Sequence, residues 1–210
     1  MKSQAKTIIK VCGMRDSQNI SALARLSIDW MGMIFWSGSK RYVSTPPDHL
    51  PQGLKIVGVF VDASLDDIRQ HVVDYQLDLI QLHGHETPEF LKALKPLILV
   101  KAFNIASTND LKQTEAYDGI ADYFLFDTKG KVVGGNGEKF DWSVLSSYQG
   151  STPFLLSGGI GPEDAESVKS FHHPKCIGID LNSRFEIAPG LKDINKLATF
   201  IKQLNYVQQD

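Results

Sequence analysis

Short apolar segments alternate with segments of helical pattern along the chain, and this alternation constrains the fold more than any other feature. Eight segments are short, apolar and rich in β-branched or aromatic residues, as strands buried on both faces tend to be. They are residues 7–12, 30–35, 55–61, 78–83, 97–103, 123–127, 152–157 and 176–181. Their starts recur roughly every 19 to 29 residues, which is the length of a βα unit.

Helical signals lie between most of these strand segments. Capping side chains such as Ser64 and prolines at a first helical position, such as Pro88, mark where helices begin. Helices are predicted over residues 19–26, 65–73, 107–116 and 192–204, after Thr87 and after Gly161, with room for only short helices within 42–51 and near 142–147.

Eight strand–helix units without a break in composition predict an α/β fold, a single (β/α)8 TIM barrel over residues 1–210. The rival fold is a doubly wound open sheet. That fold usually has fewer strands, and its G-x-G-x-x-G turn does not follow the first strand here. The barrel is therefore the favoured interpretation.

The composition narrows the classes of function. The formal net charge is -2, whereas a nucleic-acid-binding protein normally has a basic face or tail. No segment approaches the ~18 uninterrupted apolar residues of a membrane span, and residues 1–6 lack the apolar core of a signal peptide. We therefore expect a cytoplasmic protein with no nucleic-acid or membrane partner. Its two cysteines, Cys12 and Cys176, are expected to be reduced rather than joined in a disulfide.

The C-terminal ends of the strands are where a barrel of this kind carries its chemistry. The polar residues at or just after these ends include Cys12, Arg41, Asp62, Gln81, His83, His85, Glu86, Lys101, Asp127, Ser157, Asp180, Asn182 and Ser183. A thiol, several carboxylates, histidines and an arginine are therefore expected to converge on one mouth.

The loops after the seventh and eighth strands predict a phosphate site. The segment SGGIGPEDA places Gly158 and Gly159 before a helix start, where backbone N–H groups can face an anion. Asn182 and Ser183 would add a hydroxyl and more backbone at the next strand end, and such loops often bind phosphate in barrels. The alternative is that the two glycines only make a tight turn. A second glycine cluster, residues 134–137, is either a flap over the same mouth or a flexible loop.

His83, His85 and Glu86 invite a metal interpretation. A catalytic zinc site needs three protein ligands, and no further histidine lies at a strand end. We therefore expect neither a metal nor another cofactor. His83 is expected to face the mouth as a hydrogen-bond partner, and His85 to be exposed.

Cys12 and Asp127 form the pair with the clearest chemical meaning. A free thiol has a pKa of about 8.5, and a neighbouring cation raises its thiolate fraction. Desolvation can raise the pKa of an aspartic acid until it holds a proton near neutrality. A base and an acid on opposite sides of a mouth suit an isomerase. On the residues alone, Cys12 is equally consistent with core packing. Gly13 is expected to turn the backbone away from a bound sugar.

These motifs together resemble a known family. They are KVCGMRD, SKRYVS, VGVFVD, QLHGHE, FDT with GGNGEKFDW, LSGGIGPEDA, and GIDLNSRFE with PGLKD, and they span all the units in order. In them the chain resembles the phosphoribosylanthranilate isomerases of tryptophan biosynthesis. The resemblance implies a barrel without metal or cofactor, monomeric or homodimeric. It would convert N-(5-phosphoribosyl)anthranilate into 1-(2-carboxyphenylamino)-1-deoxyribulose 5-phosphate by an Amadori rearrangement.

The resemblance also implies individual roles. Asp127 matches the general acid that opens the ribose ring, and Cys12 matches the general base that removes the C2 proton. Arg41 matches the arginine that holds the anthranilate carboxylate, since a guanidinium can donate two parallel hydrogen bonds to it. Further contacts to the small phosphorylated substrate are expected from Gln81, His83, Gly158, Gly159, Asp180, Asn182 and Ser183.

Arg184 departs from the family pattern, because many members have glycine there. Arginine would either restrict a backbone that needs positive φ or add a cation near the phosphate.

Two alternatives to this family remain. Another phosphosugar barrel enzyme is the nearer one. A histidine-pathway isomerase would have an aspartate where Cys12 stands, and indoleglycerol-phosphate synthase uses lysine acids, for which Lys101 is the main candidate here. A non-catalytic phosphate-binding barrel would need the glycine loops but not the pair of Cys12 and Asp127.

Overall fold

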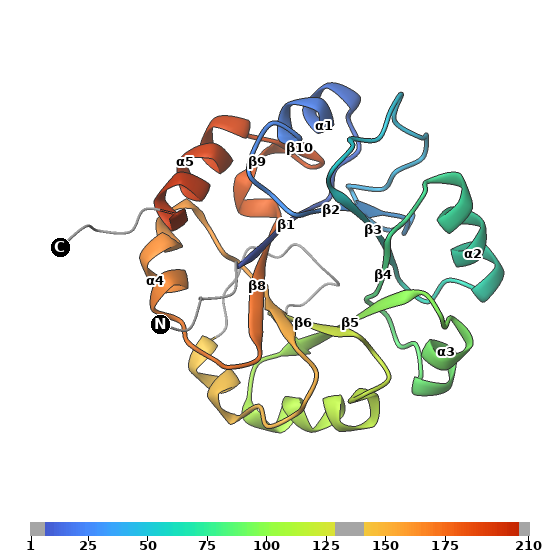
Figure 1. Cartoon of the computed structure of the whole chain (residues 1–210), viewed down its shortest axis with the longest axis vertical. Helices are drawn as coiled ribbons and strands as arrows, with labels where there is room; N and C mark the ends of the chain where they lie inside the picture. Colours follow the sequence, from blue (N-terminus) through green and yellow to red (C-terminus); the bar gives the residue numbers. More distant parts are fainter. Residues whose placement is uncertain (1–6, 129–140, 206–210) are drawn as a thin grey trace.

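The structure is a computed structural model in which residues 7–128 and 141–205 are described. Parallel strands β1 to β8 pair in chain order and close into one barrel, with the helices arranged around its outside (Figure 1). The strands are β1 (Ile8–Cys12), β2 (Trp30–Ile34), β3 (Lys55–Phe60), β4 (Leu79–Leu82), β5 (Ile98–Ile105), β6 (Tyr123–Thr128), β7 (Phe154–Leu156) and β8 (Cys176–Leu181). The predicted (β/α)8 TIM barrel is confirmed, and the open doubly wound sheet is excluded because β1 pairs with β8.

The helices around the barrel are of mixed type. They are α1 (Ser17–Leu23), α2 (Leu65–Asp74), α3 (Pro88–Ala93), α4 (Ala165–Ser170) and α5 (Ile194–Asn205), with 3₁₀ segments η1 (Thr108–Tyr117), η2 (Trp142–Ser147), η3 (Pro162–Asp164) and η4 (Ser183–Phe185). The predicted cap at Ser64 forms, because its side chain accepts from the Asp67 N–H, and the Asp16 side chain caps α1 by accepting from the Asn19 N–H. The predicted helix over 107–116 is a 3₁₀ segment, and residues 42–51 contain no helix.

A hairpin that the sequence did not predict follows β8. Strands β9 (Glu186–Ala188) and β10 (Leu191–Lys192) pair antiparallel, and Gly190 lies in their turn with φ +81. The Asn19 amide joins the hairpin to α1, because its Nδ2 donates to the Lys192 carbonyl (2.9 Å) and its Oδ1 accepts from the Lys192 N–H (2.8 Å). The hairpin is thereby fixed beside the end of β1.

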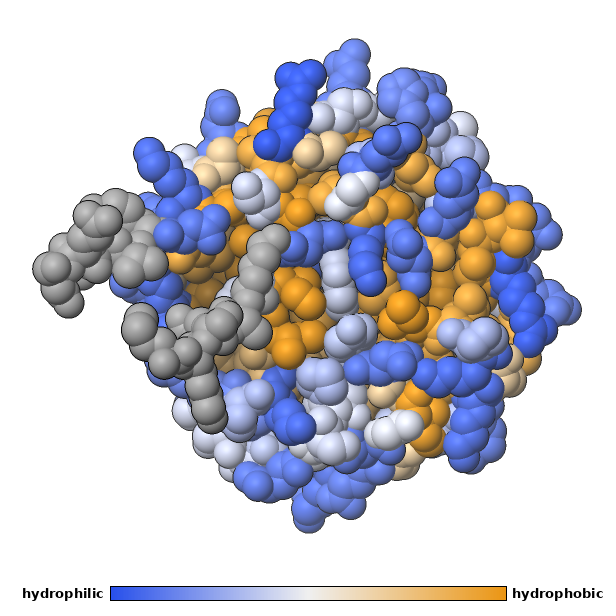
Figure 2. Space-filling view, viewed as in Figure 1, coloured by the Kyte–Doolittle hydropathy of each residue, from blue (hydrophilic) through white to orange (hydrophobic). Residues whose placement is uncertain are grey.

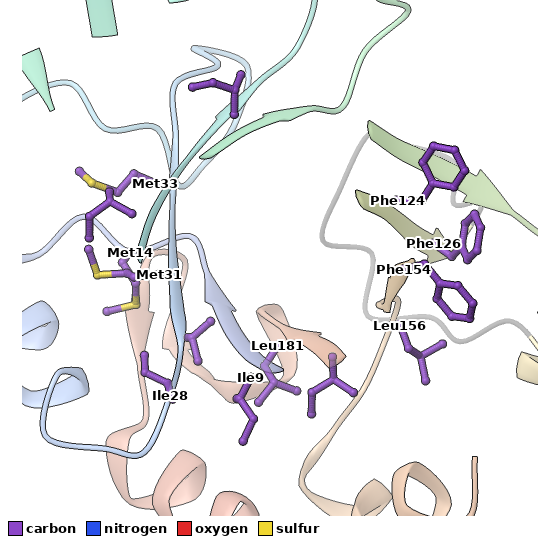
Figure 3. Close-up of a cluster of buried hydrophobic side chains, with 14 of the residues drawn as sticks. Ile9, Met14, Ile28, Met31, Met33, Phe124, Phe126, Phe154, Leu156 and Leu181 are labelled. Atoms are coloured by element: carbon purple, nitrogen blue, oxygen red, sulfur yellow. The ribbon is translucent and has the colours of Figure 1, made fainter. Parts of the chain in front are cut away.

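The core has two parts, because successive residues of a strand point to opposite faces. The outer part packs between strands and helices, and Figure 3 shows Met31 and Met33 on β2, with Phe124, Phe126 and Phe154 on β6 and β7. The inner part fills the barrel and is formed by Trp30, Val57, Leu79, Val100, Ala102, Leu125 and Leu155. The barrel is therefore a packed interior, and only its C-terminal end is free to hold a ligand.

Hydrophilic side chains cover much of the outer ring of helices, and apolar side chains gather nearer the middle of the face seen in Figure 2. None of the helices in the described ranges has the length and apolar character to cross a membrane.

Candidate active site

One cavity lies at the C-terminal ends of the strands. It is lined by the ten residues that the sequence assigned to catalysis or substrate binding, namely Cys12, Arg41, Gln81, His83, Asp127, Gly158, Gly159, Asp180, Asn182 and Ser183. Four other polar residues that were expected at the mouth do not line it, namely Asp62, His85, Glu86 and Lys101. Ile34, Trp36, Val59 and Val61 give it an apolar wall, which the sequence reading did not identify. The glycine cluster 134–137 lies outside the described residues. Strands distant in sequence thus bring the predicted groups to one place.

Cys12 ends β1 and is almost fully buried, with 3% of its surface exposed. Burial raises the pKa of its thiol above the usual value, while the Lys10 and Lys192 ammonium groups oppose this shift. Cys12 and Cys176 are both free. They lie at opposite ends of the β1–β8 pair, where Val11 stands beside Leu181, so they cannot form a disulfide.

Gly13 follows with φ +82, a conformation that glycine adopts at little cost. A Cβ there would come within 2.7 Å of Arg41 Cδ and 2.9 Å of Asn182 Oδ1. The glycine therefore leaves room for these two side chains, and its expected role beside a bound sugar stays a prediction.

Asp127 stands near the end of β6, inside the mouth. Burial raises the pKa of its carboxyl to about 6, although the Thr128 N–H, which donates to Oδ1 at 2.8 Å, acts in the opposite direction. The neighbouring Asp180 adds to the upward shift and Lys10 opposes it. Asp127 can therefore bind and release a proton close to neutral pH.

His83 and Gln81 project from the end of β4 into the same mouth. Burial, together with the charges of Lys101 and Lys10, lowers the pKa of His83 to about 4, so the ring is neutral at pH 7. The Gln81 Nε2 group donates to His83 Nδ1 (3.1 Å), and His83 Nε2 lies 3.6 Å from Asp127 Oδ2. Within the described residues, Gln81 Oε1 and His83 Nε2 are buried without a hydrogen-bond partner. Both side chains line the cavity, so these two atoms are candidates for hydrogen bonds to a ligand.

The other residues of the QLHGHE motif turn away from the mouth. His85 is 93% exposed and lies 3.1 Å from Asp62, whereas Glu86 is buried and pairs with Lys101 at 2.9 Å. Residues 7–128 and 141–205 contain no group of three histidine, cysteine, aspartate or glutamate side chains arranged to hold a metal. Lys101 does not line the cavity, so it does not supply the catalytic lysine that an indoleglycerol-phosphate synthase would need.

A buried ion pair that the sequence reading missed supports the floor of the mouth. Lys10, with no exposed surface, donates to Asp180 Oδ1 at 2.7 Å. Ser157 Oγ donates to Asp180 Oδ2 at 3.3 Å. The signal was available, because Lys10 lies two residues before Cys12 and therefore shares its face of β1.

A second charged cluster ties Arg41 to the hairpin. Arg41 Nε donates to Glu186 Oε1 at 2.8 Å, and Arg41 Nη2 donates to Glu186 Oε2 at 2.7 Å. Lys192 Nζ donates to Glu186 Oε1 (2.6 Å) and to Asn182 Oδ1 (2.8 Å). The sequence alone predicted no role for Glu186 or Lys192, although Glu186 lies in the motif GIDLNSRFE and Lys192 in PGLKD.

The predicted phosphate loops follow β7 and β8, and the second of them contacts the charged cluster, because Lys192 Nζ donates to Asn182 Oδ1. Gly158 and Gly159 have φ values of +87 and +69, which only glycine adopts readily. A Cβ on Gly158 would collide with Thr128. Arg184 has no positive φ, so glycine is not required at its position. Its Nη2 donates to Glu163 Oε1 at 2.6 Å, and it lines the cavity as a cation at the rim.

Comparison with known proteins identifies the relatives of this chain. The family model described as N-(5'phosphoribosyl)anthranilate (PRA) isomerase matches residues 9–203. A relative from Parabacteroides distasonis named N-(5'-phosphoribosyl)anthranilate isomerase is 51% identical over 205 residues, which cover 94% of this chain and 93% of the relative.

Solved structures agree with this relationship. Phosphoribosyl anthranilate isomerase from Thermotoga maritima superposes with a TM-score of 0.83 at 28% identity, covering 95% of this chain and 98% of that one. Another isomerase, solved with reduced 1-(o-carboxyphenylamino)-1-deoxyribulose 5-phosphate, has a TM-score of 0.80 at 27% identity, with 95% and 98% covered.

Proposed function

The chain belongs to the N-(5'-phosphoribosyl)anthranilate isomerase family, and we infer that it converts N-(5-phosphoribosyl)anthranilate into 1-(2-carboxyphenylamino)-1-deoxyribulose 5-phosphate in tryptophan biosynthesis. The observation that carries the mechanism is the presence of Cys12 and Asp127 on one cavity, with the pKa of Asp127 at about 6. A non-catalytic phosphate-binding barrel would need neither group.

Asp127 acts first, as the general acid. Its proton moves to the ribose ring oxygen, the C1–O bond breaks, and the nitrogen lone pair forms a C1=N bond. The product of this step is a Schiff base cation and the Asp127 carboxylate. A carboxyl with a pKa of about 6 retains enough protonated form near neutrality to do this.

Cys12 acts second, as the general base. Its thiolate removes the proton from C2, and the C–H electron pair forms a C1=C2 bond that neutralises the Schiff base as an enolamine. The C2 hydroxyl then loses a proton and C1 gains one, which leaves the ketone. Lys10 and Lys192 favour this thiolate, but burial outweighs them and raises the pKa of Cys12, so the thiolate that reacts is a minor form in equilibrium with the thiol.

The remaining residues hold the two ends of the substrate. The edge of Arg41 that Glu186 does not occupy donates to the anthranilate carboxylate, and Trp36 and Val59 contribute apolar surface for its ring. The phosphate lies at Gly158 and Gly159. Ser183 adds a hydroxyl and Arg184 a positive charge. Neutral His83 and Gln81 bind ribose hydroxyls through their unpaired atoms.

The described site residues all belong to one chain, so the proposed mechanism works in a monomer or a homodimer. We place the enzyme in the cytoplasm with its small-molecule substrate.

The function is tested by following the fluorescence of freshly prepared phosphoribosylanthranilate as the purified protein consumes it. We expect turnover without added metal, and no change in rate with EDTA. A loss of rate in EDTA that zinc restores would overturn the metal-free mechanism, and the absence of turnover would overturn the function.

A further inference from the structure

Glu186 is a buried charged residue near the active site to which the acid–base mechanism assigns no role. It begins the β9–β10 hairpin, and its side chain is 6% exposed. Its carboxylate accepts hydrogen bonds from Arg41 Nε and Nη2, from Lys192 Nζ and from the Gly190 N–H at 3.1 Å. Burial alone would raise the pKa of Glu186, but the Arg41 and Lys192 hydrogen bonds outweigh it, and the pKa lies below its usual value. Glu186 is therefore a fixed anion.

The contact with Arg41 has the geometry of a fork. Two parallel bonds of 2.8 and 2.7 Å occupy one edge of the guanidinium, and such an arrangement sets the orientation of the group as well as attracting it. A guanidinium has a second edge, formed by Nη1 and the other hydrogen of Nη2. Because Arg41 lines the cavity, fixing the first edge decides where the second one can donate.

We propose that Glu186 is a positioning residue for substrate binding, which acts through Arg41 by holding its guanidinium so that the remaining edge meets the substrate carboxylate. This inference rests on the proposed function, because it needs a ligand that carries that carboxylate.

The charges of the cluster fit this role. Arg41 and Lys192 bring two positive charges and Glu186 one negative charge, which leaves one net positive charge for a singly charged carboxylate. Lys192 is also bonded to Asn182 and, through its backbone, to Asn19. Glu186 is thus held by Lys192 of β10, which is itself bonded to α1 and to the end of β8, and by the Gly190 N–H. A fixed partner of this kind lowers the entropy that Arg41 loses on binding.

The test compares two ligands by calorimetry: the reduced product 1-(o-carboxyphenylamino)-1-deoxyribulose 5-phosphate, and the same compound without its carboxyl group. Glu186→Gln should weaken binding of the carboxylated ligand about tenfold, as expected when a charged hydrogen-bonded contact is impaired, and leave the other ligand nearly unaffected. The KM of the substrate should rise more than kcat falls. Glu186→Asp, which keeps the charge but shortens the side chain, should change binding in the same direction.

A double-mutant cycle separates positioning from simple support of the hairpin. If Glu186 acts through Arg41, then Glu186→Gln should add almost nothing in the Arg41→Ala background. Glu166→Gln removes an exposed partner of Lys169 and serves as the matched control, with no expected change.

Equal weakening of both ligands, additive effects in the cycle, or no effect of either Glu186 variant would overturn the positioning role. In each of those cases the wild-type enzyme still turns over substrate. A wild-type protein without turnover or binding would instead overturn the proposed function, and this inference with it.

Discussion

Near the mouth of the barrel, the two faces of a strand bury opposite kinds of side chain, although deeper in the barrel the inner face is apolar as well. On β1, Ile9 and Val11 face the helices and belong to the outer apolar core, whereas Lys10 and Cys12 face the barrel interior. On β6, Phe126 faces outward into the same core, and Asp127 faces the mouth. Neighbouring residues of one strand thus serve different purposes.

This contrast shows how the fold stabilises the buried charged side chains at the mouth. Burial of outward apolar surface stabilises the barrel by roughly 25 cal/mol per Å², whereas each buried charge loses hydration and needs a partner. The buried charges are therefore paired, Lys10 with Asp180 and Arg41 with Glu186. Substitutions on the outer face should therefore change stability, and substitutions of the inward-facing residues at the mouth should change chemistry.

The largest effect is expected on the inner face, from Cys12→Ser. The hydroxyl matches the thiol in size but hardly ionises near neutrality, so kcat should fall by about 10²–10⁴-fold, the usual contribution of an acid–base group. The melting temperature should change little. Steady-state kinetics and thermal unfolding of the same preparation measure both quantities.

Cys176→Ala is the matched control for Cys12→Ser, because Cys176 begins β8 at the other end of the barrel. It should keep nearly full activity. A well-folded Cys12→Ser enzyme with wild-type kcat would show that Cys12 is a packing residue and that the base lies elsewhere.

On the outer face, Phe154→Ala should show the opposite behaviour. Phe154 is fully buried, with ring centroids 4.8 Å from Phe126 and 5.6 Å from Tyr148. Its removal leaves a cavity and should cost about 3–5 kcal/mol of unfolding free energy. Activity per folded molecule should stay near the wild-type value when it is measured well below the melting temperature. Phe154→Leu should lose less stability, and a large loss of kcat in either folded variant would break the contrast between the faces.

The same contrast explains what the sequence could predict. The strands were predictable because their outward residues form apolar runs of regular spacing, and the mouth followed because polar residues collect where those runs end. The residues assigned to catalysis or substrate binding do line one cavity, whereas Asp62, His85, Glu86 and Lys101, also expected at the mouth, do not. Their catalytic and binding roles remain predictions that the experiments above address.

The parts that could not be predicted depend on tertiary contacts. The pairing of Arg41 with Glu186 joins residues 145 positions apart, and no pattern in the sequence near either residue predicts it. The β9–β10 hairpin has strands of three and two residues, too short for a periodic signal. The 3₁₀ form of η1 was hidden as well, since its sequence carries a capping serine and would suit an α-helix equally.

Arg41→Ala separates substrate binding from proton transfer at the mouth, because Arg41 is proposed to bind the substrate carboxylate and not to transfer a proton. Loss of a charged hydrogen-bonded contact should cost on the order of 1.5–3 kcal/mol of binding free energy. KM should rise more than kcat falls, since the contact is expected to be equal in the ground and transition states. Arg41→Lys keeps the charge but not the fork, and should recover only part of the loss. An unchanged KM in Arg41→Ala would show that Arg41 serves only the hairpin.

The smallest expected effect is the change in stability caused by Asp127→Asn, which is measured separately from its effect on catalysis. The pKa of Asp127 is raised from 3.8 to about 6 in the folded protein, so the folded state holds this proton more tightly than the unfolded chain does. Ionising Asp127 therefore costs stability, and this cost grows as the pH rises through about 6. An asparagine avoids the cost, so the variant should be more stable than the wild type by about 1–3 kcal/mol above that pH. Below a pH of about 4 the gain should vanish, because aspartate is then protonated in both states.

Asp118→Asn should change the stability in the opposite direction to Asp127→Asn, because the Asp118 carboxylate is stabilised in the folded state. Burial would raise the pKa of Asp118, but hydrogen bonds from Ser151 and Thr152 outweigh it and lower the pKa to about 2. Asp118 thus contributes stability above the unfolded value near 4, and the contribution is lost as the pH falls toward 2. Its variant should be less stable than the wild type at neutral pH.

Denaturant unfolding at pH 4, 5.5 and 7.5 measures the stability of both variants, Asp127→Asn and Asp118→Asn. Stability differences that do not change with pH for Asp127→Asn would mean that its carboxyl titrates normally, and the general acid would then lack the protonated form that the mechanism requires.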